Sequence, residues 1–177
     1  MIQLRRFSTS LVRSVVLPIK QVSLKNIVLS TKQPLPATPK RHIKTSLKCL
    51  KNRHAASASN EMWLASSNQL KIFLRTYELD VESYSMKNEV VKYLIKHYAP
   101  NKEELRKSWK NSYALHLNGY EDELDLYSIH ALMLDSYKFC NIIFDIKQQN
   151  LFNKQKLLED WKGGLDRQVL PFIFIFL

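Results

Sequence analysis

The sequence predicts an all-α fold built from antiparallel helical hairpins that follow a disordered N-terminal presequence. Beyond residue 60, apolar residues recur at the helical spacing i, i+3, i+4 and i+7. The apolar–polar alternation that marks a strand is absent, and the 177 residues include only three glycines. Two architectures stay open, a repeat array or a small bundle, because both join helices of similar length by short loops.

Five or six helices are expected. Their starts fall near residues 66, 84, 101, 119, 136 and 153, which are 17 or 18 residues apart, a spacing typical of helical-hairpin arrays. One face of the first helix would hold four apolar residues: Leu70, Phe73, Leu74 and Tyr77. Ser85 can cap the second helix, and Pro100 would end it at Ala99, because proline disfavours α geometry in the preceding residue.

The third helix has the clearest start, because Asn101 and Glu104 have the spacing of a capping box. Its inward residues would be Leu105, Trp109 and Tyr113. Asn118 and Gly119 are typical of a helix C-terminus. The acidic run at 121–123 would then begin the fourth helix, where the helix dipole stabilises negative charge.

A break near Asp135 and Ser136 is expected to separate the fourth and fifth helices. Their inward residues would be Leu124, Tyr127, Ala131 and Leu134, and then Phe139, Ile142, Ile143 and Ile146. Asn153 can begin the last helix, and Gly163 and Gly164 would end it.

Positive charge is concentrated in the first sixty residues, which contain twelve Lys and Arg and no Asp or Glu. Residues 61–177 hold 15 basic and 16 acidic residues, a formal charge of −1, although the whole chain carries +11. An Arg- and Ser-rich leader without acidic residues is typical of a mitochondrial import signal. The alternatives are a basic arm that binds nucleic acid and a solvated tail without a role.

Residues 4–17 can form the amphipathic helix that the import machinery recognises. The expected targeting residues are Arg5, Arg6 and Arg13. Residues 5–10 and 53–57 both resemble processing sites, and cleavage at the second would leave a mature chain that begins near Ala55. That mature chain would be close to neutral, so nucleic-acid binding would need a local basic patch.

The predicted domains are a targeting presequence and linker at 1–60, an α-helical domain at 61–164 and an apolar tail at 165–177. Pro34, Pro36 and Pro39 indicate that 31–60 is a linker without a packed core. Residues 169–177 are strongly apolar but too few to span a bilayer. They are interpreted as a contact with a partner or the inner-membrane surface, or as the misread end of a longer repeat protein.

Residues 143–151, Ile-Phe-Asp-Ile-Lys-Gln-Gln-Asn-Leu, resemble the second helix of a pentatricopeptide repeat, which has an apolar-Phe-acidic-x-Met pattern before a turn. The match covers one helix. It implies core positions for Phe144 and Ile146 and places Asn150 where the family has its usual turn glycine. It also implies binding of single-stranded organellar RNA through first-helix residues.

A basic stripe on the third helix fits such a role. Lys102, Arg106 and Lys110 lie at i, i+4 and i+8, and Tyr113 is close by. Cations next to an aromatic ring can line a phosphate track. The alternative is a solvated face whose cations pair with Glu103 and Glu104.

No catalytic pattern is present. The nucleophile elbow, the P-loop and the dinucleotide fingerprint are all absent, and His97, His116 and His130 have no further ligands at metal-binding spacing. Cys140 is expected to be a buried thiol. The sequence therefore predicts no enzyme, no cofactor and no metal site.

Two functions follow from these observations. The first is an RNA-associated helical-repeat protein of the mitochondrial matrix, which supports the processing, stability or translation of organellar transcripts and has mitochondrial RNA or a ribonucleoprotein as its partner. The alternative is a non-catalytic mitochondrial assembly factor or mitoribosomal subunit that acts through protein–protein contacts.

Overall fold

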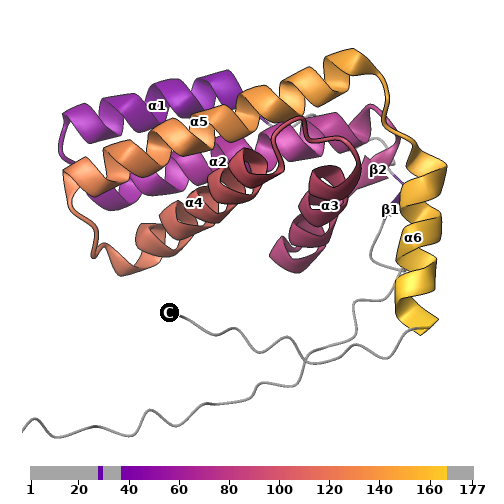
Figure 1. Cartoon of the computed structure of the whole chain (residues 1–177). Helices are drawn as coiled ribbons and strands as arrows, with labels where there is room; N and C mark the ends of the chain where they lie inside the picture. Colours follow the sequence, from indigo (N-terminus) through magenta and orange to yellow (C-terminus); the bar gives the residue numbers. More distant parts are fainter. Residues whose placement is uncertain (1–27, 30–36, 167–177) are drawn as a thin grey trace, which may run out of the picture.

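The computed structural model describes residues 28–29 and 37–166, with side chains from 37 to 161, and this part of the chain is all-α as predicted (Figure 1). Its helices are α1 (Pro39–Lys51), α2 (Ala55–Arg75), α3 (Tyr84–His97), α4 (Lys102–Glu121), α5 (Leu126–Gln149) and α6 (Lys154–Asp166). Two short strands that the sequence did not predict, β1 (Val28–Leu29) and β2 (Leu79–Asp80), pair antiparallel.

The helices form a small bundle. The central helix is α2, which lies against α1, α4 and α5, while α1 also reaches α5 (Figure 1). In a repeat array each helix would contact mainly its neighbours in sequence. Contacts between helices distant in the chain, such as α1 with α5, therefore favour the bundle.

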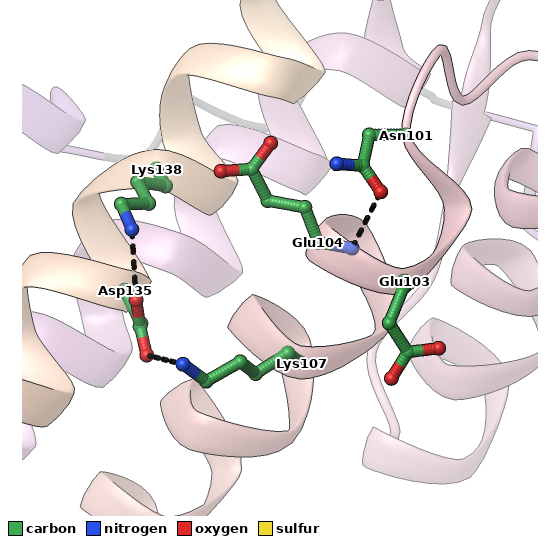
Figure 2. A pocket seen from close by; sticks show the side chains of 6 residues that line it. All are labelled: Asn101, Glu103, Glu104, Lys107, Asp135 and Lys138. Atoms are coloured by element: carbon green, nitrogen blue, oxygen red, sulfur yellow. Dashed lines mark hydrogen bonds and ion pairs between the residues drawn. The ribbon is translucent and has the colours of Figure 1, made fainter.

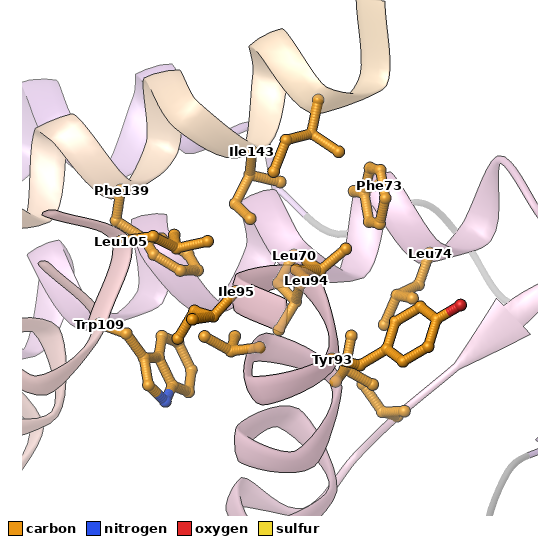
Figure 3. Packing of buried hydrophobic residues seen from close by; sticks show 14 of the residues in the cluster. Leu70, Phe73, Leu74, Tyr93, Leu94, Ile95, Leu105, Trp109, Phe139 and Ile143 are labelled. Atoms are coloured by element: carbon orange, nitrogen blue, oxygen red, sulfur yellow. The ribbon is translucent and has the colours of Figure 1, made fainter. Parts of the chain in front are cut away.

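The buried residues form two clusters along the bundle. The larger one lies where α2, α3, α4 and α5 meet, and it includes Phe73, Leu94, Trp109 and Phe139 (Figure 3). The smaller cluster joins α2, α4 and α5 closer to the α1–α2 turn, and residues of α1 pack against it. Its buried members are Ala58, Met62, Ala65, Leu115, Ile129, Met133 and Cys140.

The expectation that 31–60 lacks a packed core is wrong, because α1 belongs to the bundle. Pro39 takes the first helical position, where its missing N–H loses no hydrogen bond. Ile43, Ser46 and Leu50, at i, i+3 and i+7, then face the smaller cluster. The helical domain consequently begins at Pro39 and not at residue 61, and α2 begins at Ala55 and not near 66.

The expected boundary between the third and fourth helices is also wrong. Asn118 does not end a helix; its side-chain amide donates to Ser59 Oγ (2.9 Å), and its Oδ1 accepts from the Leu124 N–H (2.8 Å). The helix α4 continues to Glu121, and Asp122 follows in the left-handed conformation. The acidic run at 121–123 thus lies at a helix end, and Asp125 is the residue that caps α5.

The break expected near Asp135 and Ser136 does not exist, because α5 is continuous. The buried Ser136 hydroxyl bonds back to the Leu132 carbonyl (3.0 Å), so it does not compete with the helix. The inward face also differs from the prediction: Ile129 and Met133 are buried. The residues expected to face inward but found exposed are Tyr127, Ala131 and Leu134. With these boundaries the helix starts have no regular 17- or 18-residue spacing.

Local capping signals were predicted more successfully. Asn101 Oδ1 accepts from the Glu104 N–H (3.1 Å), and Asn153 Oδ1 accepts from the Lys156 N–H (2.9 Å), as expected. The cap of α3 is Ser83 instead of Ser85. The last helix runs through both glycines to Asp166.

Candidate nucleic-acid interface

The exposed face of α1 carries five cations, which we call the α1 ridge: Lys40, Arg41, Lys44, Lys48 and Lys51. The helix contains no carboxylate. Within the described residues, no Asp or Glu forms an ion pair with any of the five. At 1.5 Å per residue, the ridge extends for about 16 Å along one side of the bundle.

The ridge is held on a firmly attached helix. Near its N-terminus, His42 Nδ1 bonds to Glu61 Oε2 (2.7 Å), and His42 Nε2 contacts Asn68 Nδ2 (3.1 Å). Asn68 also donates to the Ala37 carbonyl (3.1 Å). In the middle, the Ser46 hydroxyl donates to a backbone carbonyl of α2. These bonds hold one face of α1 against α2 and leave the cations on the other.

The basic stripe predicted from the sequence lies on α4. Lys102, Arg106 and Lys110 are all exposed, but Arg106 forms an ion pair with Glu103 one turn away. The positive potential of this stripe is therefore partly neutralised, as the solvated-face alternative expected. Within the described residues, the cations of the α1 ridge form no such ion pair, so their positive charge is not neutralised in this way.

A surface pocket lies beside the α4 stripe, between the start of α4 and the middle of α5 (Figure 2). It is lined by Asn101, Glu103, Glu104, Lys107, Asp135 and Lys138. Asp135 binds Lys107 Nζ (3.3 Å) and Lys138 Nζ (3.2 Å), and it accepts from the Asn111 amide (2.7 Å). Burial raises the pKa of Asp135, but the bonds from Lys138, Lys107 and Asn111 outweigh it and hold the pKa below its usual value. The charges satisfy one another, so this site joins α4 to α5.

Tyr113 is part of an aromatic ladder and is not a free ring. Its ring stacks on Tyr84 with centroids 4.0 Å apart, and burial together with Tyr113 raises the pKa of Tyr84 to about 12. His116, the next member, stacks on Trp63 (4.6 Å). Tyr120 closes the ladder with its edge towards His116 and is 77% exposed. Tyr120 is therefore the ring of this ladder on which a nucleic-acid base could stack. The only indication of this residue in the sequence is its position seven residues after Tyr113.

The segment that resembles a pentatricopeptide repeat forms the C-terminal end of α5. Ile146 is buried, and Asn150 adopts the left-handed conformation with φ 51°. The core position implied for Phe144 is wrong, because this side chain is half exposed. The face of α5 that packs into the core at this end carries Ile143 and Ile146, and Phe144 lies outside it.

The remaining candidate residues form no second site. Cys140 is buried as expected, and burial raises its pKa to about 11, so the thiol is unreactive near neutral pH. The described residues include no group of three or more His, Cys, Asp or Glu arranged to hold a metal ion. Within the same residues, no helix is long and apolar enough to cross a membrane. Arg5, Arg6, Arg13 and the apolar residues 169–177 lie outside the described part of the chain.

No family model, no curated protein and no solved structure matches this chain.

Proposed function

We propose that this chain is a non-catalytic mitochondrial protein that binds RNA and supports the processing, stability or translation of organellar transcripts. The observation that carries the proposal is the α1 ridge, where five cations share one exposed face and, within the described residues, form no ion pair with a carboxylate. Lys and Arg side chains arranged in this way bind a phosphate backbone and release its counterions. The ridge is the local basic patch that RNA binding requires.

The net charge of the folded body supports the same proposal. Residues 39–166 hold 20 Lys and Arg against 16 Asp and Glu, a formal charge of +4. From the sequence alone, the positive charge was assigned to a removable leader, and the remaining domain was expected to be close to neutral. Because α1 packs into the bundle, five of these charges stay with the folded protein.

We place presequence processing upstream of Pro39, at the segment 5–10. Cleavage near Ala55 would remove α1 and uncover Ala58, Met62 and Met133, which are buried under it or beside it. Uncovering apolar core residues destabilises a small domain and promotes aggregation. A matrix protein processed at the earlier segment keeps both its core and its ridge.

The chemistry of the ridge indicates binding with little sequence selectivity. Ammonium and guanidinium groups in a row contact phosphates, which position a nucleic acid but carry no base information. Base stacking could be added at Tyr120, whose ring accepts any base. We therefore assign the protein to a supporting role on transcripts and not to the reading of a defined sequence.

A second candidate function is a mitochondrial assembly factor or mitoribosomal subunit that acts through protein–protein contacts. The observation in its favour is the set of large apolar side chains exposed along α5, which suit a protein partner better than a phosphate backbone.

The two candidates are separated by ultraviolet crosslinking in isolated mitochondria that contain the tagged full chain. We expect RNA to be recovered with the wild type. Recovery should fall strongly for a ridge variant, in which Lys40, Lys44 and Lys48 are changed to Gln. A matched α4 variant, with Lys102, Arg106 and Lys110 changed to Gln, should keep most of the recovery.

Equal recovery from the ridge variant and the wild type would contradict the assignment to α1. Absence of RNA from the wild type, together with co-purification of one protein complex, would favour the second candidate. Immunoblots of the organelles check the import of both variants. Import should be equal, because neither variant changes Arg5, Arg6 or Arg13.

A further inference from the structure

The outer face of α5 carries a row of exposed apolar side chains, which we call the α5 stripe. It consists of Tyr127 (84% exposed), Leu134 (54%), Tyr137 (47%) and Phe144 (51%), and Leu151 (65%) continues it just beyond the helix. Large apolar side chains scattered singly over a surface need no explanation, but several of them gathered on one face of a helix indicate an interface.

The stripe has the spacing of a coiled-coil seam. Its members on the helix are separated by seven, three and seven residues. Leu151 lies beyond the end of the helix, after the left-handed Asn150. His130, Asn141 and Gln148 occupy the remaining positions of a heptad a/d pattern. The core residues Ile129 and Ile143 lie on the opposite side of α5. One face of α5 thus builds the bundle, and the other presents a seam that is apolar except at the three polar positions.

We propose that a second copy of this chain packs on the α5 stripe, with the two α5 helices antiparallel. Lys138 and Asp145 are both exposed, are seven residues apart and border the same side of the stripe. Lys138 also contacts Asp135 of its own chain, but its side chain is 53% exposed and can reach a second carboxylate. In an antiparallel pair whose two-fold axis passes near Asn141, each Lys138 lies beside the Asp145 of the second copy, which gives two equivalent ion pairs.

The helix α1 lies beside the N-terminal half of α5 (Figure 1). There the hydroxyl of Ser46 on α1 contacts the sulfur of Met133 on α5. A parallel pair would bring the two α1 ridges to the same level, so that ten cations would repel one another. An antiparallel pair moves the two ridges to opposite ends of the interface. Each α1 then lies beside the C-terminal half of the second copy's α5, which the second copy's own α1 does not cover.

Covering the five exposed apolar side chains on both copies would bury on the order of 1,000 Å², at the lower limit of stable protein–protein interfaces. Tyrosines are enriched in such interfaces. We therefore expect a weak dimer and test for it at a protein concentration of tens of micromolar.

Sedimentation velocity of the full chain tests the proposal. We expect the wild type to form a dimer at tens of micromolar. A seam variant, with Leu134→Glu and Phe144→Glu, should be a monomer at the same concentration. The control is Tyr120→Glu, which introduces the same charge at an exposed aromatic residue of α4 and should leave the dimer intact. Far-UV circular dichroism verifies that all three chains are folded.

The antiparallel arrangement has its own test. Lys138→Glu and Asp145→Lys should each weaken dimerisation roughly threefold to tenfold, since each reversal affects two pairs. The double variant should recover most of the wild-type affinity. A wild type that stays monomeric, or a seam variant that still dimerises, would overturn the proposal. Failure of the double variant to recover would overturn the antiparallel geometry.

Discussion

The hydroxyl of Ser46 on α1 donates a 2.6 Å hydrogen bond to the backbone carbonyl of Ala58 on α2, and both residues are fully buried. This contact lies inside the segment that the charge pattern assigned to a discarded leader. It shows that α1 is part of the core and that its cations belong to the folded protein.

Removing this hydrogen bond should destabilise the bundle. Ser46→Ala deletes the donor and leaves a small gap, so we expect the free energy of unfolding to fall by about 1 kcal/mol. Urea denaturation followed by circular dichroism measures the change. Ser57→Ala, at an exposed position of α2, is the matched control and should have almost no effect. Equal stability of the two variants would mean that α1 is only loosely attached.

Asp135 should stabilise the α4–α5 contact in a pH-dependent way. We expect Asp135→Asn to reduce the free energy of unfolding by about 1 kcal/mol at pH 7, because bonds to charged partners are lost. The folded pKa is lowered, so this stabilisation is present above the ordinary value of 3.8 and is lost as the pH falls through the folded pKa. Denaturation curves of wild type and variant should therefore converge only below pH 3.8, whereas Glu123→Gln, at an exposed carboxylate, should match the wild type at pH 7.

His116 should make the protein less stable in mild acid. Its pKa is lowered by burial and by the nearby Lys87, and its Nδ1 is buried without a hydrogen-bond partner. The neutral ring is favoured in the fold, so its contribution is complete above pH 6.5 and is lost as the pH falls through the folded pKa. We expect His116→Phe, which keeps the stack on Trp63, to reduce the loss of urea midpoint between pH 7.5 and pH 5.5. The exposed His54→Gln should show the wild-type loss, and the same loss in His116→Phe would refute the assignment.

The mature protein should retain α1. Intact-mass analysis of the tagged protein from mitochondria should give an N-terminus upstream of Pro39, because the core requires Ile43, Ser46 and Leu50. An N-terminus near Ala55 would contradict this. Changing Arg5, Arg6 and Arg13 to Glu should leave the chain in the cytosol, since an import helix needs positive charge.

The sequence predicted those elements that local chemistry determines. Asn101 and Asn153 cap helices through bonds to N–H groups three residues away, so a short segment contains the whole signal. The fully buried residues Leu70, Phe73 and Leu74 were recognised for the same reason, because a single turn of α2 carries them.

Predictions from the sequence were wrong where contacts between residues distant in the chain determine the structure. Two faces of α5 have helical apolar spacing, and only the packing shows that Ile129 is buried while Tyr127 is exposed. In the sequence Asn118 is typical of a helix C-terminus, but its side-chain amide donates a hydrogen bond to Ser59 of another helix. The α1 ridge was missed because its cations resemble those of a targeting leader, and only the packing of α1 against α2 assigns that helix to the domain.

The most direct test of the central claim is the salt dependence of RNA binding by the folded protein, measured by fluorescence anisotropy with a labelled single-stranded RNA. If the five cations of the ridge contact phosphates, the logarithm of the binding constant should fall against the logarithm of salt concentration with a slope of about −3.5. The ridge variant should lower the magnitude of the slope to about 1.4, while the α4 variant leaves it near the wild-type value. Identical slopes for the ridge variant and the wild type, or binding that does not respond to salt, would contradict RNA recognition by α1.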